Sequence, residues 1–125
     1  MALRKVIESD LSQVGKLSGL PLPPRVAYTY EYNVTATSVR TATPDAWRGK
    51  IVTFRARTND VFILFGDATV TADDSAVAGA TGCCQVIPVE QSTDWYVSPT
   101  ADCDYFAVKA ASGNTAKLRS HVSSF

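Results

Sequence analysis

A two-residue alternation over residues 26–37 constrains the fold more than any other feature of this chain. The residues expected on one side of the backbone are Val26, Tyr28, Tyr30, Tyr32, Val34 and Ala36, and those expected on the other are Thr29, Glu31, Asn33, Thr35 and Thr37. Successive side chains of an extended strand point to opposite faces, so this spacing buries one face and leaves the other polar. The pattern predicts one long, half-buried antiparallel strand.

Two later segments have strand patterns of different kinds. Residues 50–58 alternate again, with Val52, Phe54 and Ala56 expected inward and Arg55 and Arg57 expected outward. Residues 61–66 are apolar on both faces, which predicts a central strand covered on both sides.

Further strands are expected near residues 83–89, 95–97, 105–110 and 117–122, with a weak strand and a long loop over 67–82. Pro44-Asp45 and Asn59-Asp60 are turn candidates, and Ser112-Gly113-Asn114 is expected to join the last two strands as a hairpin. The chain has 11 Ser and 13 Thr residues, and Thr, like Val and Tyr, suits a pleated, half-buried surface. We therefore expect an all-β fold over residues 25–125: an antiparallel two-sheet sandwich, jelly-roll-like, with an N-terminal arm.

The arm comprises residues 1–24 and ends in a Pro-rich linker. The prolines at 21, 23 and 24 stop any helix before them and favour extended backbone. Apolar positions upstream recur at spacings of three and four, as in a short amphipathic helix, and an extended strap is the alternative. A helix this short needs a partner for its apolar face, so we expect either this domain or a neighbouring protein to hold the arm, and our hypothesis is contact with a neighbour. The residues expected to make this contact are Leu3, Val6, Ile7, Leu11, Val14 and Leu17.

Composition excludes several classes of function. Twelve basic residues balance twelve acidic ones, which argues against a nucleic-acid binder that works through bulk electrostatics. No apolar run approaches the roughly 18 residues of a membrane span. Glu8, Asp10 and Lys16 interrupt the apolar stretch that a secretion signal requires, so we expect synthesis in the cytosol of the producing cell.

The three cysteines are expected to be small buried hydrophobic residues. Cys83 and Cys84 are adjacent and Cys103 is the odd one out, which is not a disulfide framework. A bridge from Cys103 to either of the others is the alternative, if the two segments are neighbouring strands. A zinc site is not expected, because the C-x-x-C spacing is missing and His121 is the chain's single histidine.

No catalytic or cofactor motif is present. His121 stands near Ser123 in an alternating segment without a nucleophile elbow, and we interpret it as an ordinary strand-end residue. Asp73-Asp74 lacks the pattern of a calcium loop, and no phosphate-binding glycine motif occurs. We expect a protein that is not an enzyme and that needs no cofactor or metal.

The aromatic residues are expected to fill the core or a subunit interface. The alternative is that they stack on sugars or bases at the surface. The residues concerned are Tyr28, Tyr30, Tyr32, Trp47 and Trp95.

Several segments together resemble a known class of proteins. Residues 47–56 read WRGKIVTFRA, residues 60–66 read DVFILFG, and residues 105–113 read YFAVKAASG, followed by Lys117-Leu118-Arg119 and a Ser-rich end. Over residues 26–125 this order is similar to the small β-sandwich virion proteins of tailed bacteriophages, including capsid decoration (cement) proteins and related head or tail proteins. The resemblance implies a structural role, often as a trimer on the capsid lattice, and it brings no catalytic residues.

On this basis we expect a structural virion protein that is assembled in the host cytoplasm. Its expected partners are the major capsid protein or other virion proteins, and its expected state is a homotrimer. The alternatives are a phage tail or receptor-binding component, in which exposed aromatic residues contact glycans, and a small carbohydrate-binding module.

Overall fold

The computed structural model describes residues 21–73 and 82–125. Within them the chain forms eight strands: β1 (Thr29–Val34), β2 (Val39–Ala42), β3 (Lys50–Arg57), β4 (Val61–Gly66), β5 (Gln85–Ile87), β6 (Ser92–Val97), β7 (Tyr105–Lys109) and β8 (Ala116–Val122). Three single-turn 3-10 helices accompany them: η1 (Val26–Tyr28), η2 (Asp45–Trp47) and η3 (Ala101–Cys103). None of the helices in this part of the chain has the length and apolar character to cross a membrane.

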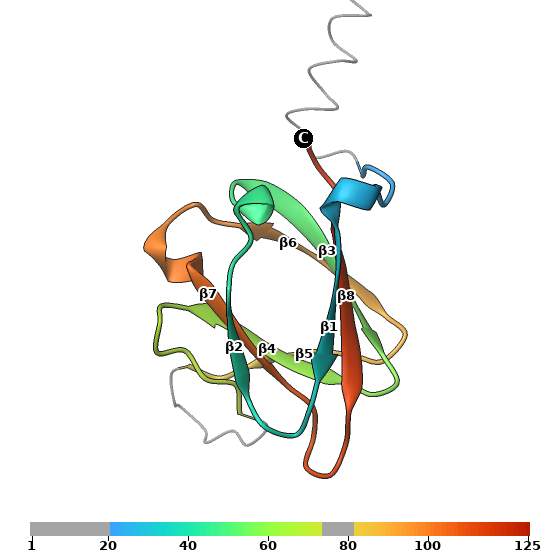
Figure 1. The fold of residues 1–125 in the computed structure, drawn as a ribbon, viewed down its shortest axis with the longest axis vertical. Helices are drawn as coiled ribbons and strands as arrows, with labels where there is room; N and C mark the ends of the chain where they lie inside the picture. The colour runs from blue at the N-terminus through green and yellow to red at the C-terminus, as the bar shows by residue number, and fades with distance from the viewer. Residues whose placement is uncertain (1–20, 74–81) are drawn as a thin grey trace, which may run out of the picture.

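The strands form two four-stranded antiparallel sheets that face each other (Figure 1). One sheet has the order β1-β8-β3-β6 and the other has the order β2-β7-β4-β5. This order is that of an eight-stranded jelly roll, in which consecutive strands lie in different sheets except for the paired strands β4 and β5. The prediction of an all-β, jelly-roll-like sandwich is confirmed.

Alternation within the strands explains how each sheet buries one face. In β3, Val52, Phe54 and Ala56 are fully buried, while the residues between them are half-exposed, as the sequence predicts. In β8, every second residue from Ala116 to Val122 is buried. Both strands lie in the interior of the first sheet, where inward side chains meet the other sheet.

Strand β4 is covered on both faces, as predicted. Val61 and Ile63 belong to the main core between the sheets. Leu64 points to the opposite face and packs with Val70 and Ala72 from the segment that follows β4. Each face of β4 therefore packs against an apolar cluster, which explains why the strand has apolar residues on both faces.

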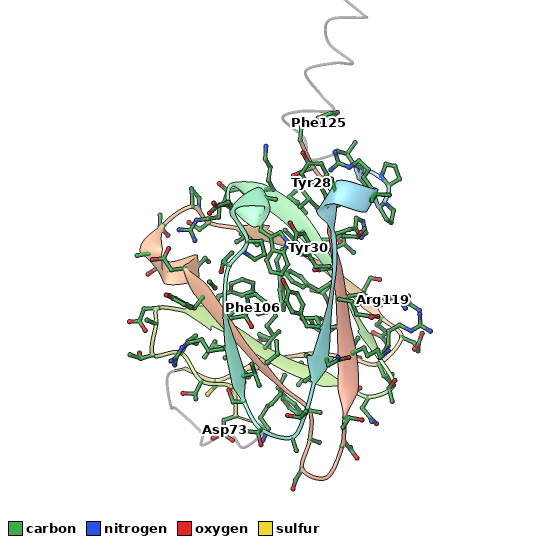
Figure 2. The ribbon with its side chains drawn as sticks, in the orientation of Figure 1. Tyr28, Tyr30, Asp73, Phe106, Arg119 and Phe125 are labelled. Carbon is green, nitrogen blue, oxygen red and sulfur yellow. The ribbon has the colours of Figure 1, made fainter. Side chains whose placement is uncertain are left out.

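An aromatic cluster occupies the main core. Trp47, which is 0% exposed, makes edge-to-face contacts with Tyr30, Tyr32 and Phe54 at centroid distances of 5.4, 6.2 and 5.3 Å. Phe106 lies 5.2 Å from Trp47 in a tilted arrangement. Figure 2 shows Tyr30 and Phe106 pointing into the space between the sheets.

Two predicted turns connect different sheets and not neighbouring strands. The turn at Gly113 exists and has a positive φ of 79°, but β7 and β8 lie in different sheets, so the predicted hairpin is wrong. The predicted two-residue turn at Asn59-Asp60 is a three-residue connection from β3 to β4 that begins at Thr58, with φ 79°. It also crosses between sheets, and Asn59 Nδ2 donates to the Thr115 carbonyl at 2.7 Å.

The predicted strand boundaries need three corrections. The strand expected over 26–37 is limited to Thr29–Val34, because residues 26–28 form η1, in which Val26 is 99% exposed. Strand β2 was not expected, since its four residues have no strong alternation and depend on pairing with β7. Residues 67–73 contain no strand, and residues 74–81 lie outside the described part.

Candidate functional site

Polar side chains collect on the outer face of the β1-β8-β3-β6 sheet. The antiparallel register aligns outward residues of different strands in rows across the sheet. One row consists of Thr29, His121, Thr53 and Asp94, and the next consists of Glu31, Arg119, Arg55 and Ser92. The rows combine hydroxyl, carboxylate, guanidinium and imidazole groups on one rigid surface.

A groove of about 560 Å³ lies over these rows. Arg119 points outward from β8, on the side of the molecule away from the core (Figure 2). The residues lining the groove are Pro24, Thr29, Tyr30, Glu31, Thr53, Arg55, Ser92, Arg119, Ser120 and His121. This is the candidate functional site, and we call it the sheet groove.

Ion pairs compensate the charges around the sheet groove. Arg119 Nε donates to Glu31 Oε1 at 2.8 Å, and this hydrogen bond holds the pKa of Glu31 below its usual value of 4.5. Glu90 lies between two guanidinium groups: Arg55 Nη2 donates to its Oε2 at 2.9 Å, and Arg57 Nε lies 3.4 Å from its Oε1. Such exposed pairs add little stability, but they leave no large field of one sign.

The surroundings of His121 favour its uncharged form. Partial burial lowers the pKa of His121 below its usual value of 6.5, and the neighbouring Arg25 cation acts in the same direction. Asp94 and a hydrogen bond to the backbone of Leu22 oppose this shift. A neutral imidazole has one nitrogen that donates and one that accepts a hydrogen bond.

The segment 21–25, which we call the strap, borders the sheet groove at one end. The Leu22 N–H donates to the Ser123 carbonyl at 2.8 Å, and Arg25 Nη2 donates to the Val122 carbonyl at 3.0 Å. Pro24 has no N–H to donate and lines the groove instead. The strap thereby fastens the chain upstream of β1 to the C-terminal end of β8.

The residues predicted to bind a partner lie outside the described part of the chain. They are Leu3, Val6, Ile7, Leu11, Val14 and Leu17.

The predicted role of the aromatic residues in the core is confirmed for four of the five. Trp47 is fully buried, and Tyr30, Tyr32 and Trp95 pack against the core with partial exposure. Burial raises the pKa of Tyr32 to about 12. Tyr28 is 38% exposed on η1, where the Arg25 guanidinium lies 4.5 Å from its ring centroid.

The prediction of buried cysteines is wrong for Cys83 and is met in part by Cys84 and Cys103, which pack against the two apolar clusters. Cys83 is exposed and Cys84 and Cys103 are half-buried, and none of the three forms a disulfide. Cys83 and Cys84 precede β5 and Cys103 lies in η3, so these residues do not belong to the strands that were expected to bury them. The Asp73 N–H donates to Cys84 Sγ at 3.1 Å.

The other chemical candidates remain separate from one another. Ser123 Oγ donates to the Ile51 carbonyl at 3.2 Å, so it is occupied with backbone near His121. Of the Asp73-Asp74 pair, only Asp73 belongs to the described residues. Within 21–73 and 82–125, no three His, Cys, Asp or Glu side chains lie close enough to hold a metal ion.

Sequence reasoning identified Arg55 and His121 individually but missed the sheet groove. Alternation indicated which residues of a strand point outward, as it did for Glu31. It could not indicate that β8 lies between β1 and β3, and this order is what places Arg119 beside both Glu31 and Arg55.

Comparisons with known proteins give little further information. No protein-family model matches the chain, and no curated protein matches it. A solved structure from Bacillus endospore appendages, described as a novel family of disulfide-linked pili, is similar at 14% identity and a TM-score of 0.39. The match covers 75% of this chain and 82% of the pilus chain.

Proposed function

We propose that the protein is a non-enzymatic structural subunit that joins a larger assembly through its N-terminal arm. The specific form of the proposal is a capsid decoration (cement) protein that binds the lattice of the major capsid protein and stabilises the head of a phage. The virion assignment comes from the sequence resemblance alone, since the matched structure is an endospore pilus and not a phage protein.

The observation that carries the proposal is the fastening of the strap to β8. Strand β8 is paired on both sides, with β1 and with β3. Hydrogen bonds from Leu22 and Arg25 join the base of the arm to the end of this interior strand. A force on the arm would therefore be transmitted to the sheet through these hydrogen bonds, as a protein that holds neighbouring subunits together requires.

The surface at this end of the sandwich also suits a protein contact. Val26 is 99% exposed, Phe125 is 53% exposed and Tyr28 is 38% exposed. Tyr28 and Phe125 lie at the same end of the molecule (Figure 2). Exposed apolar groups gathered at one end of a domain are typical of an interaction surface.

The first test is the oligomeric state by size-exclusion chromatography with light scattering. We expect a trimer for the full chain and a smaller species for the Ile7→Ser/Leu11→Ser variant, because these changes remove apolar arm contacts. The matched control is Glu8→Ser/Gln13→Ser, which changes polar positions of the same arm and should remain trimeric. Identical masses for all three proteins would contradict the proposed role of the arm in self-association.

The second test concerns the virion itself. Particles purified from the producing culture and analysed by quantitative mass spectrometry should contain the chain in many copies, at a fixed ratio to the major capsid protein. Its absence from such particles would refute the decoration role, while the oligomerisation result would still stand for another assembly.

A receptor-binding component is the second candidate, because the sheet groove offers a ligand site on the outer surface. In that case glycan contact would not involve Trp47, which is fully buried.

A further inference from the structure

We propose that the sheet groove binds a neutral oligosaccharide that lies across the strands. The proposal rests on the polar rows of the β1-β8-β3-β6 sheet and is independent of the arm. The volume of about 560 Å³ falls within the roughly 300–1,000 Å³ of typical ligand clefts.

The groove presents hydrogen-bond donors and acceptors in close alternation. Arg119 uses Nε for Glu31, which leaves its terminal N–H groups and further carboxylate lone pairs for a ligand. Thr29 and Ser92 supply hydroxyl groups, and neutral His121, whose N–H bonds to the backbone of Leu22, supplies an acceptor nitrogen. Sugar hydroxyls both donate and accept, so they match such a mixed surface.

Charge compensation favours a neutral ligand over an ionic one. The carboxylates of Glu31 and Glu90 already pair with Arg119, Arg55 and Arg57. An anionic ligand would lie beside carboxylates that repel it and already neutralise these guanidinium groups, whereas a neutral polyol can bond to the pairs as they stand.

The groove also has rigid support and apolar neighbours. Its residues lie mainly on paired strands, which hold side chains in place more firmly than loops do. Pro24 forms part of the lining. Tyr96 stands on the same face of β6, two residues beyond Asp94, and is 62% exposed. A tyrosine ring there can pack against the apolar C–H face of a pyranose.

The proposal is tested by NMR titration of isotope-labelled full-length protein with maltohexaose, cellohexaose, xylohexaose and chitohexaose at millimolar concentrations, alongside a glycan array. We expect at least one neutral saccharide to shift the His121 ring signals and the amides of the groove. Arg119→Gln and Ser92→Ala should each weaken the binding about tenfold, the loss of roughly one good hydrogen bond to the ligand.

Arg40→Gln is the matched control, because Arg40 lies on β2 in the other sheet and its loss should leave the affinity unchanged. Binding that is equal in the Arg119 and Arg40 variants would overturn the assignment of the site. Binding of a heparin-derived oligosaccharide alone, or of no neutral glycan in either assay, would overturn the ligand class. Ile7→Ser/Leu11→Ser should leave saccharide binding intact, so failure here is distinguishable from failure of the proposed assembly role.

Discussion

At the scale of single residues, Trp47 shows how position decides between structural and binding roles of an aromatic side chain. Its indole packs against Tyr30, Tyr32, Phe54 and Phe106 and is fully removed from solvent. The indole Nε1 has no hydrogen-bond partner among the described residues. Trp47 therefore stabilises the fold through apolar contact and not through its polar atom.

We expect Trp47→Ala to lower the free energy of unfolding by about 3–5 kcal/mol, because it opens a large cavity in the aromatic cluster. Trp47→Phe should cost less, since no hydrogen bond from the indole is lost. Denaturation in urea measures both, with Tyr96→Ala as the exposed aromatic control, expected within about 0.5 kcal/mol of the parent protein. A Trp47→Ala effect as small as that of the control would contradict the central position of Trp47.

The environment of His121 leads to a prediction of how the stability of the protein depends on pH. Its folded-state pKa lies below the usual 6.5, so the unfolded chain binds the proton more readily. The contribution of neutral His121 to stability is present above about pH 6.5 and is lost as the pH falls through the folded-state pKa. An NMR titration of the ring protons should have a midpoint below 6.5, and the signal needs no assignment because the chain has one histidine.

The matched variant is His121→Gln, which removes the titrating group. We expect the parent protein to lose more stability than this variant between pH 7.5 and pH 5, in parallel denaturation experiments that span the ~6.5 reference value. A midpoint above 6.5, or equal losses in both proteins, would refute the stated environment of His121.

At the scale of strands and loops, the local sequence pattern predicted which segments form strands, but it did not predict which strands pair. The inward residues of β3 follow from alternation, since a strand with one buried face needs an apolar residue at every second position. Which strands pair is decided by packing of the whole chain. Gly113 supplies a real turn, yet the strands on either side of it enter different sheets.

The connection between β6 and β7 depends on Arg48. Its guanidinium donates to the carbonyls of Pro99 and Cys103 at 3.1 Å each, and it pairs with Asp104. The Arg48 side chain is 22% exposed, so these hydrogen bonds are partly shielded from water. Because Arg48 directly follows η2, they hold the loop against this helix.

We expect Arg48→Lys to destabilise the protein by about 1–3 kcal/mol, because an ammonium group cannot reproduce the planar fork of donors. Hydrogen exchange of the amides in residues 98–104 should accelerate selectively. Arg40→Lys, on an exposed strand, is the control and should change neither quantity. Unchanged exchange in Arg48→Lys would mean that the loop is held by its own turns.

At the scale of the whole molecule, the jelly roll brings both ends of the described chain to one place. The strap enters beside Ser123, the residue that follows β8. The sequence predicted a division at residue 24 from the prolines, and this boundary stays a prediction. Leu22 and Arg25 form hydrogen bonds to β8 and its C-terminal extension, so a truncation that removes these two residues should lower the stability of the domain.

We therefore expect two truncations that differ by only a few residues to differ in stability. Removal of residues 1–20 retains the strap, whereas removal of residues 1–25 deletes the Leu22 and Arg25 hydrogen bonds and the contact of His121 with Leu22. At roughly 1 kcal/mol for each bond, the shorter protein should be less stable by about 2–3 kcal/mol in urea denaturation. The variant Arg25→Gln in the full chain should account for about 1 kcal/mol of this difference. Equal stability of the two truncated proteins would mean that the strap does not stabilise the sandwich. The arm would then lack the firm attachment to the sheet on which the proposed clamp depends.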